Sequence, residues 1–211
     1  MRNAREIVGA TGLPVAADLE NGYGDDPEES AATILQAAQA GLVGGSIEDA
    51  TGKPGNPIYP FELAVERVRA AVKAARSLPF PFILAARAEN LINGRPDLPD
   101  TIRRLEAFAE AGADVLYAPG LKTREEVSAV VKAVAPRPVN VLVGISVLRL
   151  PLEELAELGV KRVSLGSVLA RIAYGAMIQA AEGMRRKGDL SFVGNAATYA
   201  TINDVLKKSY P

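Results

Sequence analysis

The chain has 211 residues, enough for one domain with a hydrophobic core, and its 24 basic and 25 acidic side chains leave a formal net charge of −1. It contains no cysteine and no histidine, which excludes a disulfide framework, a thiolate nucleophile and the commonest general base. The balanced charge argues against a nucleic-acid partner, and no apolar run approaches the roughly 20 residues of a membrane span. We therefore expect a cytoplasmic protein that binds neither nucleic acid nor membrane.

Predicted strands and helices alternate along the chain. Apolar runs of small residues predict strands, and amphipathic segments bounded by capping residues, proline and glycine predict helices. The expected strands cover 14–19, 43–48, 80–86, 113–118, 138–143 and 161–165. The expected helices cover 2–9, 26–40, 60–78, 100–111, 123–135, 151–158, 168–187 and 196–208. All-apolar strands joined by helices indicate an α/β protein with a parallel sheet.

The pattern favours a barrel over an open sheet. Polar and acidic residues collect at the carboxyl ends of the strands, where a (β/α)8 barrel keeps its site. A doubly wound sheet would also fit the alternation, but no strand is followed by a Gly-x-Gly-x-x-Gly motif. We predict an α/β fold of the (β/α)8 TIM-type barrel family, as a single domain over 1–211. Only about six β/α units are present, and we expect the missing two to lie before Met1.

The densest group of candidate site residues follows the first strand. The apolar run Leu13–Ala17 predicts a buried strand that leads into Asp18 and Glu20. Because side chains alternate along a strand, these two carboxylates should leave its end on the same face. Like charges in such a pair need a cation or a shared proton, and the alternative is a solvated loop with two unrelated acids. Gly22 and Tyr23 follow in a tight turn that lets the backbone pass close to a ligand.

Charged side chains also follow the next two strands. Glu48 and Asp49 end the second strand, and Arg87 and Glu89 follow the third. Neighbouring strands of a parallel sheet lie about 5 Å apart, so these groups should converge with Asp18.

These groups indicate a metal site beside an anion-binding arginine. Oxygen ligands without histidine or cysteine favour Mg²⁺, or Mn²⁺, over zinc. We expect Asp18 to bind the ion directly, while Glu20 and Glu48 hold its water ligands. The planar guanidinium of Arg87 suits a substrate carboxylate. The alternative for Glu48 and Arg87 is a structural ion pair between strand ends.

The connection after Glu48 is long for a compact α/β unit. Residues 50–59 contain two glycines and two prolines, which predicts either a lid or a disordered insert. Thr51 and Lys53 are its candidate catalytic groups, and Tyr59 is the other polar group available.

Five segments, in order and over nearly the whole chain, resemble the isocitrate lyase / phosphoenolpyruvate mutase superfamily. The first three motifs together are highly specific, whereas each alone would be weak. The segments are Asp18–Gly24, Ser46–Asp49, Ala86–Glu89, Gly112–Asp114 with Pro119–Leu121, and Val163–Ser167.

The resemblance implies a Mg²⁺-dependent barrel that makes or breaks a C–C or P–C bond next to a 2-oxo acid. It implies that Asp18 is the direct metal ligand, that Glu20 and Glu48 bind the metal through water, and that Arg87 steadies the substrate. Known members pass through an enolate-like species, or a phosphoryl transfer in the mutase, whose oxyanion the metal stabilises. Members exchange their last barrel helix between partners, which implies a homodimer or homotetramer.

The chain departs from the family at three points. Glu20 stands where many members have aspartate. The segment Thr51–Gly55 replaces the one that carries the catalytic cysteine of the lyases, and members have eight strand–helix units. Without cysteine or histidine, we expect no isocitrate or methylisocitrate cleavage.

The leading hypothesis is a Mg²⁺-dependent lyase or hydrolase that acts on an oxaloacetate-like 2-oxo acid through a metal-stabilised enolate. The second is phosphonopyruvate mutase or P–C hydrolase chemistry, for which Lys53 is the obvious phosphoryl-binding cation. The third is a 2-oxo acid binder without catalysis.

Overall fold

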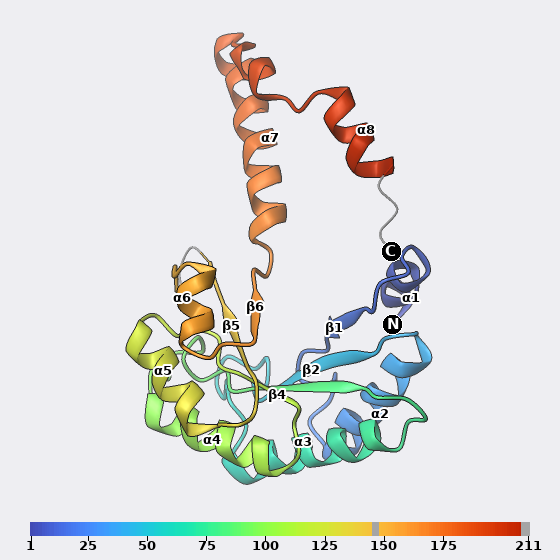
Figure 1. The fold of residues 1–211 in the computed structure, drawn as a ribbon, viewed down its shortest axis with the longest axis vertical. Coiled ribbons are helices and arrows are strands. Elements are labelled where there is room, and N and C mark those ends of the chain that lie inside the picture. Colours follow the sequence, from blue (N-terminus) through green and yellow to red (C-terminus); the bar gives the residue numbers. More distant parts are fainter. Residues whose placement is uncertain (145–147, 208–211) are drawn as a thin grey trace. The chain divides into compact units, whose positions relative to one another are not determined.

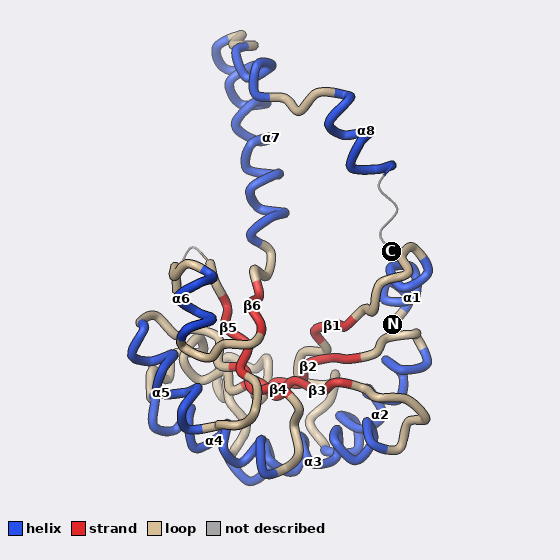
Figure 2. The backbone as a smooth tube through the Cα atoms, in the orientation of Figure 1, coloured by secondary structure: helices blue, strands red, loops and turns tan. Residues whose placement is uncertain are grey.

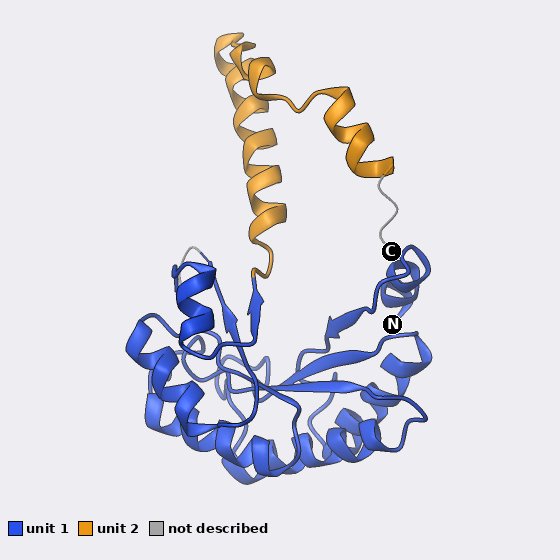
Figure 3. Cartoon of the chain, in the orientation of Figure 1, with its two compact units in different colours: residues 1–164 blue, residues 165–211 orange. Residues whose placement is uncertain are grey.

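The computed structural model describes residues 1–144 and 148–207. The chain divides into two compact units, Met1–Ser164 and Leu165–Pro211 (Figure 3). The expected single domain over the whole chain stays a prediction.

The first unit is built on one parallel sheet in which consecutive strands are neighbours (Figures 1 and 2). The sheet curls as part of a barrel, and this confirms an α/β fold of the TIM-barrel type with about six units. Its strands are β1 (Ala16–Asp18), β2 (Gly44–Glu48), β3 (Ile83–Arg87), β4 (Val115–Tyr117), β5 (Val139–Leu142) and β6 (Arg162–Ser164).

Helices follow the strands, and α2 to α5 lie on the outer side of the curled sheet (Figure 2). The helices of the unit are α1 (Arg2–Gly9), α2 (Pro27–Gln39), α3 (Phe61–Arg76), α4 (Leu98–Glu110), α5 (Arg124–Ala133) and α6 (Leu152–Glu157). Each matches an expected helix to within about two residues.

Capping boxes start two of these helices. In α5 the Thr123 hydroxyl accepts the Glu126 N–H at 3.2 Å, and the Glu126 carboxylate accepts the Thr123 N–H at 3.2 Å. In α2, Asp26 and Glu29 do the same, with Pro27 at the first helical position.

The core lies between the sheet and the helices in two neighbouring clusters. One is centred on β3 to β5 and includes Phe108, Leu116 and Val141, while the other, around β2 and α2, includes Ile34 and Ile47. This packing leaves the carboxyl ends of the strands to polar side chains.

The expectation of a buried first strand is wrong. The strand β1 is short and lies at the edge of the sheet, where it pairs only with β2 among the described strands. Ala16 and Asp18 are exposed and Ala17 is half-buried. An edge strand has no neighbouring strand on its outer side to cover it. A run of small apolar residues is therefore not enough to predict that this strand is buried.

The second unit consists of α7 (Val168–Lys187), a 3-10 turn η1 (Ser191–Asn195) and α8 (Tyr199–Lys207). None of the three has a buried residue. The last helix starts later than the expected Ala196, because Ala196 is extended after the 3-10 turn. Its expected end, Lys208, lies outside the described residues. In the described part of the chain, no helix is long and apolar enough to cross a membrane.

Candidate active site at the carboxyl ends of the strands

Strand register brings the predicted site residues to one edge of the sheet. Asp18 of β1 pairs with Ser46 of β2, and Glu48 of β2 pairs with Arg87 of β3. Arg87 in turn pairs with Tyr117 of β4. Three adjacent strands therefore bring predicted polar side chains to one edge of the sheet, and β4 adds Tyr117, which is not among the residues predicted from the sequence.

The guanidinium of Arg87 is the centre of the site. Its Nη1 donates to Asp18 Oδ2 at 2.5 Å, its Nη2 lies 3.2 Å from Glu48 Oε2, and its Nε donates to Glu89 Oε1 at 2.7 Å. The ring of Tyr117 lies against it, with the ring centroid 5.0 Å from Cζ. Three carboxylates thus share one cation.

Burial and this excess of negative charge shift the pKa values of the side chains in the site. Burial raises the pKa of Glu48 to about 7, with a further rise from the charge on Glu89 that Arg87 only partly offsets. Burial also raises the pKa of Glu89. Burial disfavours the charge on Arg87, but Glu89, Asp18 and Glu48 outweigh it, and the pKa of Arg87 is raised. The site holds a permanent cation beside a carboxyl group that titrates near neutrality.

Asp18 and Glu20 are close together, but not for the expected reason. β1 ends at Asp18, and Glu20 lies beyond it with φ 50°, a left-handed backbone conformation. The alternation of side chains along a strand therefore does not apply to this pair. Instead, Asp18 Oδ1 accepts both the Glu20 N–H and the Ser46 hydroxyl, each at 3.1 Å. The Asp18 side chain remains 58% exposed.

The donor set of the site fits a hard divalent cation. All candidate ligands are carboxylate oxygens, and three carboxylates share the single positive charge of Arg87. Across residues 1–144 and 148–207, no three acidic side chains already converge as a metal cluster. Asp18 and Glu48 both turn toward Arg87 instead. The chemistry fits Mg²⁺, and the assignment of Asp18, Glu20 and Glu48 as its ligands stays a proposal.

The turn after Glu20 has the backbone that its glycine predicts. Gly22 has φ 78°, and a Cβ built there would lie 3.1 Å from Ser30 Cα, so a side chain would be both strained and crowded. Tyr23 has φ 60° and is 61% exposed. Burial and the charges of Glu20 and Asp18 raise its pKa, which places its hydroxyl in the field of the acids.

The loop 50–59 has a buried neck and an exposed tip. At the neck, Ala50 and Ile58 form an antiparallel bridge, and both are buried. Thr51 is also buried, and its hydroxyl donates to the Asn56 carbonyl and accepts the Lys53 N–H. This neck is ordered structure, so a disordered insert is not what the structure shows.

The ammonium group of Lys53 extends from the loop tip to the carboxylate of Asp25 in the glycine turn. That carboxylate also accepts a hydrogen bond from the Tyr59 hydroxyl at 2.7 Å. Contact with Asp25 raises the pKa of Lys53. The catalytic roles expected for Thr51 and Lys53 stay predictions.

A polar wall on β4, β5 and β6 was not anticipated from the sequence. Tyr117 and Asn140 are buried, and the Ser164 hydroxyl donates to Asn140 Oδ1 at 2.9 Å. The pKa of Tyr117 is raised overall by burial, and its hydrogen bond with Ser164 offsets only part of this rise. A polar residue inside each of three apolar strands is the signal that could have revealed this wall.

A curled parallel sheet with carboxylates and an arginine at its carboxyl ends has the arrangement in which barrel-type enzymes place their active sites. The chain belongs to the phosphoenolpyruvate phosphomutase family, whose profile matches residues 1–185. This confirms the resemblance to the isocitrate lyase / phosphoenolpyruvate mutase superfamily.

Relatives of the chain act on several substrates. A Burkholderia cenocepacia J2315 structure, provisionally described as a lyase/mutase, is 55% identical with a TM-score of 0.93, covering 98% of this chain and 74% of that one. Oxaloacetate decarboxylase of Bradyrhizobium diazoefficiens is 33% identical over 134 residues, 61% of this chain and 45% of that protein. A Corynebacterium glutamicum protein, provisionally described as 2-methylisocitrate lyase 2, is 29% identical over 184 residues, 84% of this chain and 58% of that protein.

The chain thus spans about half the length of these two curated relatives.

Proposed function

We propose that the protein is a Mg²⁺-dependent lyase or hydrolase that cleaves a small oxaloacetate-like 2-oxo acid through an enolate. The observation that carries this proposal is the arrangement of Arg87 among three strand-end carboxylates. The relation to oxaloacetate decarboxylase supports the choice of substrate class.

Asp18 would hold the metal directly, with Glu20 and Glu48 binding it through water. Mg²⁺ bound there would supply positive charge for an enolate oxyanion. Arg87 would present Nη1 and Nη2 to a substrate carboxylate, while Nε stays on Glu89.

The loop supplies no side chain suited to act as a carbon acid, and Glu48, whose pKa is about 7, is assigned to the water ligands of the metal. A group that protonates carbon works best with a pKa near the operating pH. The pKa of Lys53 is raised by Asp25, and burial raises the pKa of Tyr59, so both move away from neutrality. We therefore propose that the protein does not cleave isocitrate or methylisocitrate, although one of its relatives carries the latter name.

The family profile keeps P–C bond chemistry as the second candidate. Lys53 is the loop cation that a phosphoryl group would need, and its ion pair with Asp25 would have to open.

A four-substrate assay tests the proposal. The purified protein is incubated with oxaloacetate, phosphonopyruvate, isocitrate or methylisocitrate, each with Mg²⁺ and with EDTA, and products are identified by NMR. We expect Mg²⁺-dependent turnover of oxaloacetate above the protein-free rate. Turnover of phosphonopyruvate alone would support the second candidate, and cleavage of isocitrate or methylisocitrate would overturn the argument from the loop. Binding without turnover of any of the four would indicate a 2-oxo acid binder.

A further inference from the structure

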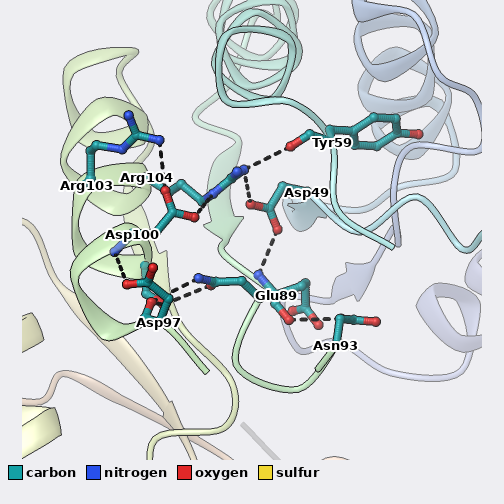
Figure 4. Close-up of polar contacts among 10 residues, drawn as sticks. Asp49, Tyr59, Glu89, Asn93, Asp97, Asp100, Arg103 and Arg104 are labelled. Carbon is teal, nitrogen blue, oxygen red and sulfur yellow. Dashed lines mark hydrogen bonds and ion pairs between the residues drawn. The ribbon is translucent and has the colours of Figure 1, made fainter. Parts of the chain in front are cut away.

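Asp49 directly follows Glu48 but faces away from the site, into the protein. Its side chain is buried, with 1% exposed. Oδ1 accepts the backbone N–H of Glu89 at 2.7 Å, and Oδ2 accepts Nη1 of Arg104 at 3.0 Å (Figure 4). One carboxylate therefore joins the end of β2 to the segment after β3 and to helix α4.

The guanidinium of Arg104 makes further hydrogen bonds that extend this connection. Nη1 also donates to the carbonyl of Tyr59 at 3.1 Å, and Nε donates to Asp100 Oδ2 at 2.8 Å. The Tyr59 N–H in turn donates to the carbonyl of Asp49 at 2.9 Å. Both ends of the loop 50–59 are thereby fixed to one buried ion pair (Figure 4).

The same pair is one step from the arginine of the site. Asp49 holds the backbone of Glu89, and the Glu89 carboxylate holds Nε of Arg87 at 2.7 Å. The Asp49 N–H also donates to the carbonyl of Arg87 at 3.2 Å. The contacts run without interruption from Arg104 to Asp49, to Glu89 and to Arg87.

We propose that Asp49 and Arg104 are a positioning pair: through Glu89 they fix the guanidinium of Arg87, and at the same time they anchor both ends of the loop 50–59. The effect of this pair on turnover rests on the proposed function, whereas its effect on the position of Arg87 does not. Neither residue touches the reacting atoms.

The burial of Asp49 and Arg104 argues that the pair is kept for positioning and not for stability alone. Taking two charges out of water costs free energy, and an apolar pair of the same volume often stabilises a protein as well or better. Hydrogen bonds that no apolar pair could make are the reason to keep the ions, and here they lead to the loop and to Arg87. Residues that orient the groups of a site typically change activity about 10- to 100-fold when mutated.

The chain supplies a matched control at the opposite end of β3. Asp114 accepts the Leu84 N–H at 2.9 Å through Oδ2 and pairs with Arg76 at 2.6 Å through Oδ1. Arg76 also donates to two backbone carbonyls. Asp114 thus contacts β3 as Asp49 contacts the segment after it, but away from the site. Because the Arg76 side chain is more exposed than that of Arg104, the two substitutions are expected to cost different amounts of stability. Activities of Asp49→Asn and Asp114→Asn are therefore compared under conditions that give the two proteins equal measured stability.

The first test needs no substrate. Protein labelled with ¹⁵N-arginine gives one Nε–H signal for each arginine, and the Arg87 signal is the one missing from Arg87→Lys. In Asp49→Asn we expect this signal to shift and its exchange with water to accelerate at least about 10-fold. In Asp114→Asn we expect it to be unchanged. An unchanged Arg87 signal in Asp49→Asn would overturn the proposal, whatever the enzyme does.

The second test uses oxaloacetate with Mg²⁺. We expect Asp49→Asn to lower kcat about 10- to 100-fold with a smaller change in KM, and Asp114→Asn at matched stability to keep both. Equal losses in the two variants would reduce the pair to a structural role and overturn the proposal. If wild-type protein turns over nothing, the proposed function fails, while the NMR result still decides the positioning role.

A milder variant covers the case in which Asp49→Asn does not fold. Asp100→Asn removes the carboxylate on Nε of Arg104 and leaves the bond to Asp49 in place. We expect the Arg87 signal to shift in the same direction by a smaller amount. No shift in a folded Asp100→Asn protein, with Asp49→Asn insoluble, would count against the proposal.

Discussion

Glu48 and Arg87 occupy paired positions at the ends of β2 and β3, and their side chains meet at 3.2 Å. They form an ion pair between strand ends, but not an isolated one. Arg87 also binds Asp18 and Glu89. Burial raises the pKa of Glu48 to about 7, with a further rise from the charge on Glu89 that Arg87 only partly offsets.

The raised pKa of Glu48 predicts how stability varies with pH in metal-free protein. Folded Glu48 binds a proton more tightly than the unfolded chain, whose ordinary pKa is 4.5, so the native state holds more protons between about pH 4.5 and 7. Its stabilising contribution is therefore full below about pH 4.5 and is lost as the pH rises to about 7. The shift corresponds to at most about 3 kcal/mol, less after solvent screening.

Urea unfolding in EDTA at pH 5 to 8 measures this slope. Glu48→Gln should flatten the dependence on pH relative to wild type, since glutamine does not titrate. The same pH dependence in both proteins would show that Glu48 has an ordinary pKa.

Removing the direct metal ligand should remove the response to Mg²⁺. A ligand that binds only the folded state stabilises it by about 2.7 kcal/mol at 100 times its dissociation constant. We expect Asp18→Asn to abolish the Mg²⁺-dependent rise in Tm and Glu20→Gln to weaken it. Glu28→Gln, on the exposed first turn of α2, should respond like wild type. A full response in Asp18→Asn would refute the ligand assignment.

The loop 50–59 should behave as a fixed neck with a mobile tip. The Thr51 and Tyr59 amides donate to the Pro57 and Asp49 carbonyls, each at 2.9 Å, whereas Lys53 and Gly55 are exposed. In hydrogen exchange we expect slow exchange at the neck and fast exchange at the tip. Oxalate with Mg²⁺ should slow the tip alone, because a closing lid excludes water from an enolate. A neck that exchanges as fast as the tip would contradict this division.

The second unit should pack against another copy of the chain. Its helices have no buried residue, and Leu169, Ile172 and Ile178 of α7 are each more than half exposed. Apolar helices of this kind favour association, and we propose a homodimer or homotetramer. Light scattering should give a mass of two or four chains. Ile172→Asp should lower it, and Arg185→Glu should not. A clean wild-type monomer would refute the proposal.

Local sequence signals were enough to predict most of the fold. The alternation of strands and helices, the Thr123 capping box and the strand-end acids each depend on residues that are close together in the sequence. The burial of β1 could not be read in this way, because it depends on which strands lie beside it. The Asp49–Arg104 pair joins residues 55 positions apart, and no local pattern predicts that these two side chains meet. The left-handed backbone of Glu20 likewise has no signal in its residue type.

The most direct test of the account is the rate of Mg²⁺-dependent oxaloacetate cleavage in wild type and Arg87→Lys, each corrected for the protein-free rate. Lysine keeps the charge but cannot bind Glu89 through Nε and present two further donors to a carboxylate. We expect measurable turnover in wild type and a kcat/KM at least about 100-fold lower in Arg87→Lys. Equal rates in the two proteins, or no turnover above background in wild type, would contradict it.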